Sequence, residues 1–190
     1  IESLDLCAEN ITSDSDMKSY KAYRGGVMFM RAYAYYRLVQ AFGPVTILRD
    51  NNQGDLSRST ANAVNKYALE DLQYGIDNMP RIRPNQNEHK GAVTAFSAEM
   101  LAAKFHLNMG NYAKVEELTN DIIEHGNFSL YPDFYQLWKI PGKLCDESIF
   151  ECQMTDFGNG SGDLMATYGL FVMVPISPAV TSAVGEIVAS

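Results

Sequence analysis

Apolar positions recur at three- and four-residue spacing in four stretches of the chain, the period of an α-helix with one buried face. In the first stretch, from Met17 to Phe42, the apolar stripe is formed by Val27, Met30, Ala34, Leu38 and Ala41. Gly25-Gly26 interrupts it, and a Gly costs about 1 kcal/mol relative to Ala inside a helix. We therefore expect this helix to begin near Gly26 or to bend there. Gly43-Pro44 ends it, because Gly accepts a left-handed cap and Pro cannot continue a helix.

Three further helices are predicted in the same way. The second follows an N-cap at Ser59 or Thr60, ends at Pro80, and has its stripe at Val64, Ala68, Leu72, Ile76 and Met79. The third begins after Thr94, with Ala98, Leu101, Ala102, Phe105 and Met109 facing inward. The fourth has Val115, Leu118 and Ile122 inside and closes at Gly126. Four helices with short connections predict a mainly α fold of two antiparallel pairs.

After Gly126 the pattern changes. Ser148 to Met154 alternates apolar and polar residues, which indicates a half-buried strand or an extended segment. Thr155 to Gly162 is rich in Gly, Asn, Asp and Ser and reads as a loop, and a last helix after Ser177-Pro178 is cut short at Ser190. We expect a helical region over 1–126 and an irregular segment with short strands over 127–190, within one domain of a fragment.

Composition narrows the possible partners. Of 190 residues, 46% are hydrophobic and 20% charged, and the net charge of -8 would repel a phosphate backbone. Nucleic acid is therefore not an expected partner. The three histidines are isolated in sequence, without the spacing of a metal site, and no nucleophile or nucleotide-binding motif is present. We predict no catalytic residue, no metal and no cofactor.

Several side chains are expected to be structural. An Arg on an apolar helix, as Arg31 is, more often pairs with a carboxylate than binds an anion. The adjacent acids Glu70-Asp71 and Glu116-Glu117 point apart on their helices and are expected on solvated faces. The aromatic residues of the first helix are assigned to the core: Phe29, Tyr33, Tyr35 and Tyr36.

The turn from Leu107 to Val115 resembles that of a tetratricopeptide (TPR) repeat, in which a Leu and a Gly close one helix and a Tyr, here Tyr112, packs back onto it. This resemblance predicts that the antiparallel pairs stack as an α-α superhelix. On its own it would indicate only a helical hairpin.

A wider ordered series resembles the SusD/RagB family. The motifs that make up this series are, in chain order, Phe29-Met30-Arg31-Ala32, Tyr35-Tyr36, Phe42-Gly43-Pro44-Val45, Met79-Pro80, Gly91-Ala92-Val93-Thr94 and Glu147-Ser148-Ile149-Phe150-Glu151. The match spans roughly Tyr20 to Met154. Gly26, where the family has Glu, and the order Pro44-Val45 depart from it. Trp138 stands at a position where the family has a bulky structural aromatic residue, so the resemblance implies that Trp138 lies in the core.

The resemblance implies a cell-surface lipoprotein of the outer membrane that binds a nutrient, a glycan above all. It would deliver this ligand to a SusC-like TonB-dependent transporter and be anchored on the extracellular face by an N-terminal lipid absent from this chain. Residues 127–190 would then begin the ligand-binding half. An intracellular TPR scaffold that binds peptides is the alternative, and a glycoside hydrolase is a third that would need a placed carboxylate pair.

Ligand contacts are expected in the loop after the matched region. Asp156, Asn159 and Tyr168 combine hydrogen-bonding groups with an aromatic face, as sugar recognition requires.

Overall fold

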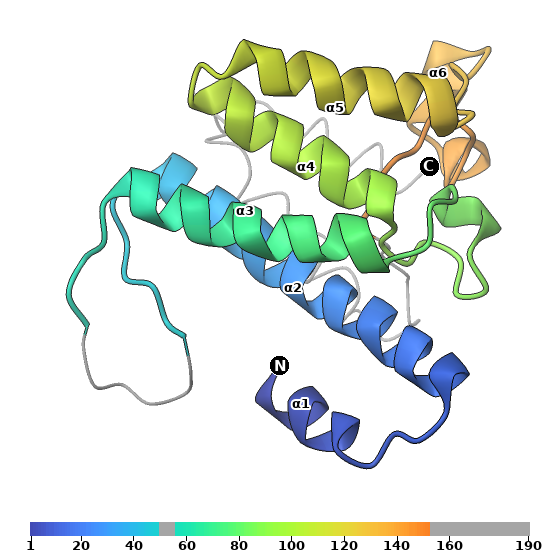
Figure 1. Ribbon diagram of the computed structural model, residues 1–190. Helices are drawn as coiled ribbons and strands as arrows, with labels where there is room; N and C mark the ends of the chain where they lie inside the picture. Colours follow the sequence, from blue (N-terminus) through green and yellow to red (C-terminus); the bar gives the residue numbers. More distant parts are fainter. Residues whose placement is uncertain (50–55, 153–190) are drawn as a thin grey trace, which may run out of the picture. The chain divides into compact units, whose positions relative to one another are not determined.

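The fold is described from a computed structural model, which defines residues 1–49 and 56–152 (Figure 1). The chain divides into two compact units, Ile1–Glu151 and Cys152–Ser190. The first unit holds every helix described below. The predicted division at residue 126 stays a prediction.

Four long helices build the first unit, and successive helices run in opposite directions (Figure 1). In chain order the helices are α1 (Glu2–Ala8), α2 (Asp14–Phe42), α3 (Ala61–Asn78), the 3-10 turn η1 (Pro84–Gln86), α4 (Ala95–Asn108), α5 (Tyr112–His125), α6 (Phe134–Leu137) and the 3-10 turn η2 (Ile140–Gly142). Each long helix packs on the next, α2 on α3, α3 on α4 and α4 on α5. The prediction of a mainly α fold with TPR-like antiparallel pairs is confirmed.

The helix α2 runs unbroken through Gly25-Gly26, so the predicted start or bend there is wrong. Gly25 lies where α2 crosses α3: a Cβ on it would meet Met79 Cγ at 2.8 Å and the Cα of Gly75 at 3.3 Å. The two backbones can come this close because neither carries a side chain at the crossing. The helix loses some propensity at Gly25 and gains close packing.

The buried face of α2 is not the predicted one. Met28, Phe29, Ala32 and Tyr35 are buried, as assigned for Phe29 and Tyr35, whereas the predicted stripe of Val27, Met30, Ala34, Leu38 and Ala41 is exposed. Apolar side chains lie on more than one face of this helix, so spacing alone fits two stripes. The face that packs is the one that α3 and α4 cover.

The faces predicted for α3 and α4 are largely confirmed. Val64, Ala68 and Leu72 of α3 and Ala98, Leu101, Ala102 and Phe105 of α4 are buried. Thr60 is the N-cap of α3, and its hydroxyl accepts a hydrogen bond from the Ala63 N–H at 3.2 Å. Met109 was wrongly assigned inside and is 44% exposed, because it lies beyond the last turn of α4.

The helix α5 buries fewer side chains than α3 or α4. Ile122 is its buried residue, and Val115 and Leu118 are half-buried. Gly110 allows the α4–α5 turn with φ +74°. The predicted packing of Tyr112 back onto the preceding helix is wrong, since Tyr112 is 69% exposed at the first position of α5.

A buried ion pair joins α2 to α3. The guanidinium of Arg31 donates to both carboxylate oxygens of Asp71, each at 2.7 Å, and lies 4.8 Å above the centre of the Tyr67 ring. The prediction that Arg31 pairs with a carboxylate is confirmed. The solvated position predicted for Asp71 is wrong, because α2 covers this carboxylate and leaves 3% of the side chain exposed.

A second charged cluster ties α5 to α4. Glu99 of α4 is 2% exposed, and Arg81, in the loop after α3, donates to it and to Asp121 of α5. Burial raises the pKa of Glu99, and this outweighs the opposing contribution of Arg81. Burial raises the pKa of Asp121, but opposing contributions, of which the hydrogen bond donated by Arg81 is the largest, outweigh burial and lower this pKa.

The segment that follows α5 is irregular, as predicted, and side chains from several helices anchor it. Arg83 donates to the Asn127 carbonyl at 2.7 Å and pairs with Asp146 at 3.2 Å. Ser97 of α4 donates to the Ile149 carbonyl at 2.8 Å. The Phe150 ring lies edge-on to that of Phe29, with centroids 5.0 Å apart.

The short strands expected in this segment are not present between residues 127 and 152. Residues 148–152 have no regular secondary structure and bend at Ile149, and Cys152, expected on the buried side of the alternation, is exposed. Alternation of apolar and polar residues is typical of a strand, but a strand also requires a partner for its backbone N–H and C=O groups. Here the Ile149 carbonyl is held by the side chain of Ser97 instead.

Replacing Asp71 by Ala should lower the free energy of unfolding by about 2 to 4 kcal/mol, because the charge of Arg31 is left without its buried partner. Asp77→Ala on the same helix removes an exposed carboxylate and serves as the control, with an expected change below about 0.5 kcal/mol. Urea denaturation of both variants checks this. Equal effects would contradict the structural role of the ion pair.

Replacing Glu99 by Gln should change how stability depends on pH. The raised pKa means that folded Glu99 keeps its proton to a higher pH than the unfolded chain, whose value is near 4.5. The wild type should therefore lose stability relative to Glu99→Gln as the pH rises above about 4.5. Chemical denaturation across pH 4 to 8 measures this, with the exposed Glu116→Gln as control. A difference that does not depend on pH would refute it.

Candidate functional site

The short helix α6 begins at a side-chain cap. The Asp133 carboxylate accepts hydrogen bonds from the backbone N–H groups of Tyr135 at 2.9 Å and Gln136 at 3.2 Å. The helix passes directly into η2, where a Cβ on Gly142 would lie 2.2 Å from the Leu137 carbonyl oxygen. Only a residue without a side chain allows this fold-back, which sets α6 and η2 against each other.

The helix α6 presents its aromatic side chains to solvent. Phe134 is 75% exposed, Tyr135 67% and Trp138 75%, and the rings of Phe134 and Trp138 meet edge-to-face with centroids 6.1 Å apart. The core position predicted for Trp138 is therefore wrong within the described part of the chain. A helix of four residues buries none of its own side chains, so its aromatic character does not imply burial.

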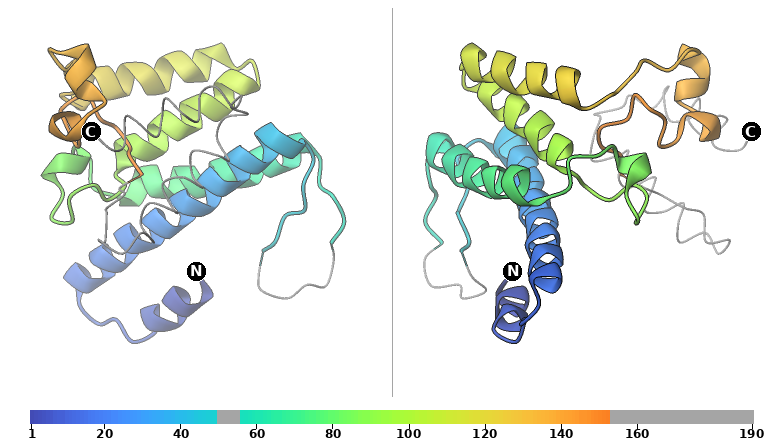
Figure 2. Two further views of the ribbon diagram at one scale, coloured as in Figure 1. Left: turned by 180° about the vertical axis from the view of Figure 1, so that it is seen from behind. Right: turned by 45° about the vertical axis from the view of Figure 1, so that its right-hand side comes forward.

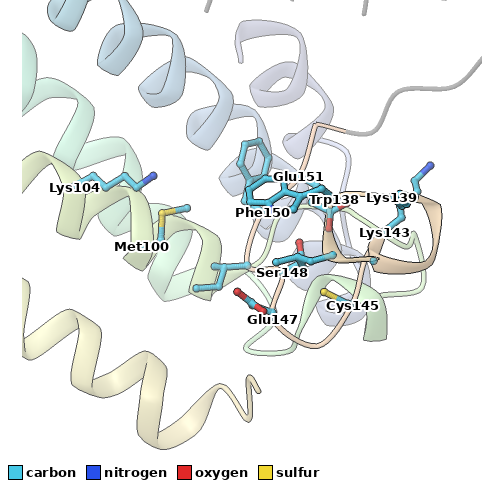
Figure 3. Close-up of a pocket in the computed structure, with 13 residues that line it drawn as sticks. Met100, Lys104, Trp138, Lys139, Lys143, Cys145, Glu147, Ser148, Phe150 and Glu151 are labelled. Atoms are coloured by element: carbon cyan, nitrogen blue, oxygen red, sulfur yellow. The ribbon is translucent and has the colours of Figure 1, made fainter. Parts of the chain in front are cut away.

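A cleft of about 630 Å³ opens beside these rings. Met100 and Lys104 of α4 form one wall, and the opposite wall runs from Leu137 through Lys143 (Figure 3). Cys145 and residues 147–151 complete it. Trp138 belongs to this second wall, and Phe150 also lines the cleft (Figure 3). The cleft therefore combines apolar and aromatic surface with a few polar groups, the usual make-up of a small-molecule site.

The two carboxylates of the cleft are already hydrogen-bonded to backbone. Glu147 accepts from the Tyr131 N–H at 2.8 Å, and Glu151 accepts from the Leu144 N–H at 2.9 Å. Both bonds hold the irregular segment in shape. Each of these acids is therefore oriented in the wall of the cleft by one backbone hydrogen bond.

A second cleft, of about 530 Å³, lies between α3, α4 and α5. A TPR scaffold would hold a peptide in such a groove. Its charged groups are largely paired with one another: Arg81 with Glu99 and Asp121, and Lys114 with Glu117. Burial and the nearby Lys114 lower the pKa of His106, which also lines it. We take the cleft beside α6 as the candidate site.

The binding residues expected from the sequence, Asp156, Asn159 and Tyr168, lie outside the described residues. Sequence reasoning missed the cleft beside α6, although the run Phe134-Tyr135-Gln136-Leu137-Trp138 was visible. The available signal was an aromatic cluster directly after Pro132-Asp133, on an element too short to have a buried face.

Across residues 1–49 and 56–152, no three His, Cys, Asp or Glu side chains gather as metal ligands. No helix of this described part is long and apolar enough to span a bilayer.

Comparison with known proteins assigns the chain to a family. A family described as "Starch-binding associating with outer membrane", SusD-like, matches residues 1–107. This match covers more than half of the chain. The chain belongs to the SusD-like family.

Other SusD-like proteins agree in sequence and in fold. A SusD-like protein of Bacteroides ovatus is 23% identical over an alignment of 146 residues, which covers 68% of this chain and 26% of that protein. Surface glycan-binding protein A from Bacteroides fluxus is similar with a TM-score of 0.72 and 25% identity, over 85% of this chain and 35% of that one. A SusD superfamily protein from Bacteroides vulgatus, at 19% identity, shares the fold with a TM-score of 0.71, over 82% of this chain and 32% of its own. This SusD-like chain thus spans about a quarter to a third of the length of these relatives.

Proposed function

We propose that this SusD-like chain contributes to a surface protein that binds a glycan, and that the cleft beside α6 is part of the binding surface. The observation that carries the proposal is the exposed ring of Trp138, which lines that cleft and meets the exposed ring of Phe134 edge-to-face. Exposed aromatic faces are costly to leave in water, and the apolar faces of sugar rings stack on them. The relative from Bacteroides fluxus, named a surface glycan-binding protein, supports the same ligand class.

Binding without turnover is part of this proposal. Glu147 and Glu151 each accept a hydrogen bond from a backbone N–H, and we assign them to holding the irregular segment rather than to acid or nucleophile chemistry on a bound sugar. The polar groups of the cleft would instead donate and accept hydrogen bonds with sugar hydroxyls. A glycan that is bound and released intact could then be passed on to another protein.

The proposal extends to the cell surface, where the full-length protein would be held on the extracellular face of the outer membrane by an N-terminal lipid. It would deliver its ligand to a SusC-like TonB-dependent transporter. The family description, which associates its members with the outer membrane, supports this location. Co-purification of such a transporter with the full-length protein from detergent-solubilised outer membranes tests the partnership.

Replacing Trp138 by Ala should weaken glycan binding roughly tenfold, because one stacking surface is lost and stacking contributes about 1 kcal/mol or more. Tyr112→Ala, which removes a similarly exposed ring from α5, is the matched control and should bind as the wild type does. Titration calorimetry against a panel of neutral and acidic oligosaccharides measures the change. Equal affinities in both variants would count against the cleft.

The same titrations, made on Asp156→Ala and Tyr168→Ala, test whether the loop from Thr155 to Tyr168 takes part in binding. We propose that Asp156, Asn159 and Tyr168 add hydrogen bonds and a second stacking face, so each variant should bind more weakly. Unchanged affinity in both would remove this loop from the proposed site.

A further inference from the structure

The cleft beside α6 carries more positive charge than the rest of the chain would suggest. The chain has 15 Lys and Arg against 23 Asp and Glu, yet three lysines line this one cleft: Lys104, Lys139 and Lys143. Lys104 comes from α4, and the other two come from the opposite wall (Figure 3). Two elements that are far apart in sequence therefore contribute lysine residues to the lining of the same cleft.

These lysines are not engaged in ion pairs with any described carboxylate. The ion pairs between described residues use Arg24, Arg31, Arg81, Arg83 and Lys114, with one protonatable partner in His125. The Lys139 ammonium instead lies 4.0 Å from the centre of the Tyr135 ring. All three side chains are exposed, and Lys104 and Lys143 can reach a ligand without breaking an ion pair, whereas Lys139 would move from the Tyr135 ring.

The acids of the same cleft do not neutralise these lysines by direct pairing. Glu147 and Glu151 accept hydrogen bonds from backbone N–H groups on their own segment. The backbone therefore orients these two carboxylates, whereas the ammonium groups keep flexible stems that can follow a ligand. Lys side chains bind carboxylate and sulfate oxygens as mobile point charges.

We propose that the ligand of this cleft is an anionic glycan, whose carboxylate or sulfate groups bind Lys104, Lys139 and Lys143 while a sugar ring stacks on Trp138. This inference rests on the proposed function and adds the ligand's charge to it. A neutral oligosaccharide would use the aromatic surface alone. An acidic one would also gain attraction to three unpaired cations, so the cleft should discriminate between two glycans with the same rings and linkages.

Matched ligands separate charge from ring stacking. We would titrate the 190-residue chain with an oligogalacturonate and with its neutral methyl ester, and with a dextran sulfate oligosaccharide and unsulfated dextran. The expected result is tighter binding of at least one acidic ligand than of its neutral counterpart, and an affinity that falls as salt increases. Comparing the two acidic ligands shows whether carboxylate or sulfate is preferred.

Matched variants locate the effect. In the triple variant Lys104→Gln/Lys139→Gln/Lys143→Gln, affinity for the preferred acidic ligand should fall roughly tenfold, with each exposed charge worth about two- to fivefold. Binding of neutral ligands should not change. The control, Lys18→Gln/Lys21→Gln/Lys66→Gln, removes the same charge from exposed positions on α2 and α3 and should bind as the wild type does.

Three outcomes would overturn the inference. Equal affinity of the wild type for the acidic and the neutral ligand of a pair would show that the cleft does not distinguish glycans by charge. The proposal that it binds a glycan would be unaffected. Equal losses in the two triple variants would show that net charge acts without a site. If no glycan in either pair bound the wild type, the proposed function would fail together with the inference.

Discussion

The ion pair between Arg31 and Asp71 is the interaction on which the helical unit depends. Both charges are removed from most of their water, and a carboxylate with 3% exposure is tolerable only with two well-aligned donors. A one-residue slide of α3 along α2 would break this geometry. The pair therefore sets the register of the two helices, and the close approach at Gly25 and Gly75 sets how near they lie.

The remaining long helices build outward from this pair, and α5 buries much less of its surface than α4 does. The helix α4 is buried along most of one side, whereas α5 buries only Ile122 and relies on the cluster of Arg81, Glu99 and Asp121. Beyond α5, hydrogen bonds from side chains replace regular backbone pairing. Arg83 and Ser97 hold the irregular segment, and Phe150 fixes its end against Phe29.

This arrangement explains why the candidate site lies where it does. An irregular segment on a rigid helical support can expose side chains that a helix pair would bury. Trp138 and Lys139 follow the end of α6, Lys143 follows η2, and α4 contributes Lys104 from the other wall (Figure 3). The chain has a net charge of -8, so it is the fold that gathers three lysines around one cleft.

The sequence by itself determined the four long helices, their order and their antiparallel pairing, because helical spacing and turn residues are local signals. It also determined the family, through an ordered series of short motifs. It also determined the inner faces of α3 and α4, which have a single apolar stripe. Only the tertiary structure decided which face of α2 is buried, since its apolar residues fit two stripes, and only it placed Asp71 inside and Trp138 outside. Burial depends on the neighbour that a side chain meets, and the neighbours of Asp71 and of Lys104 are tens of residues away in the chain.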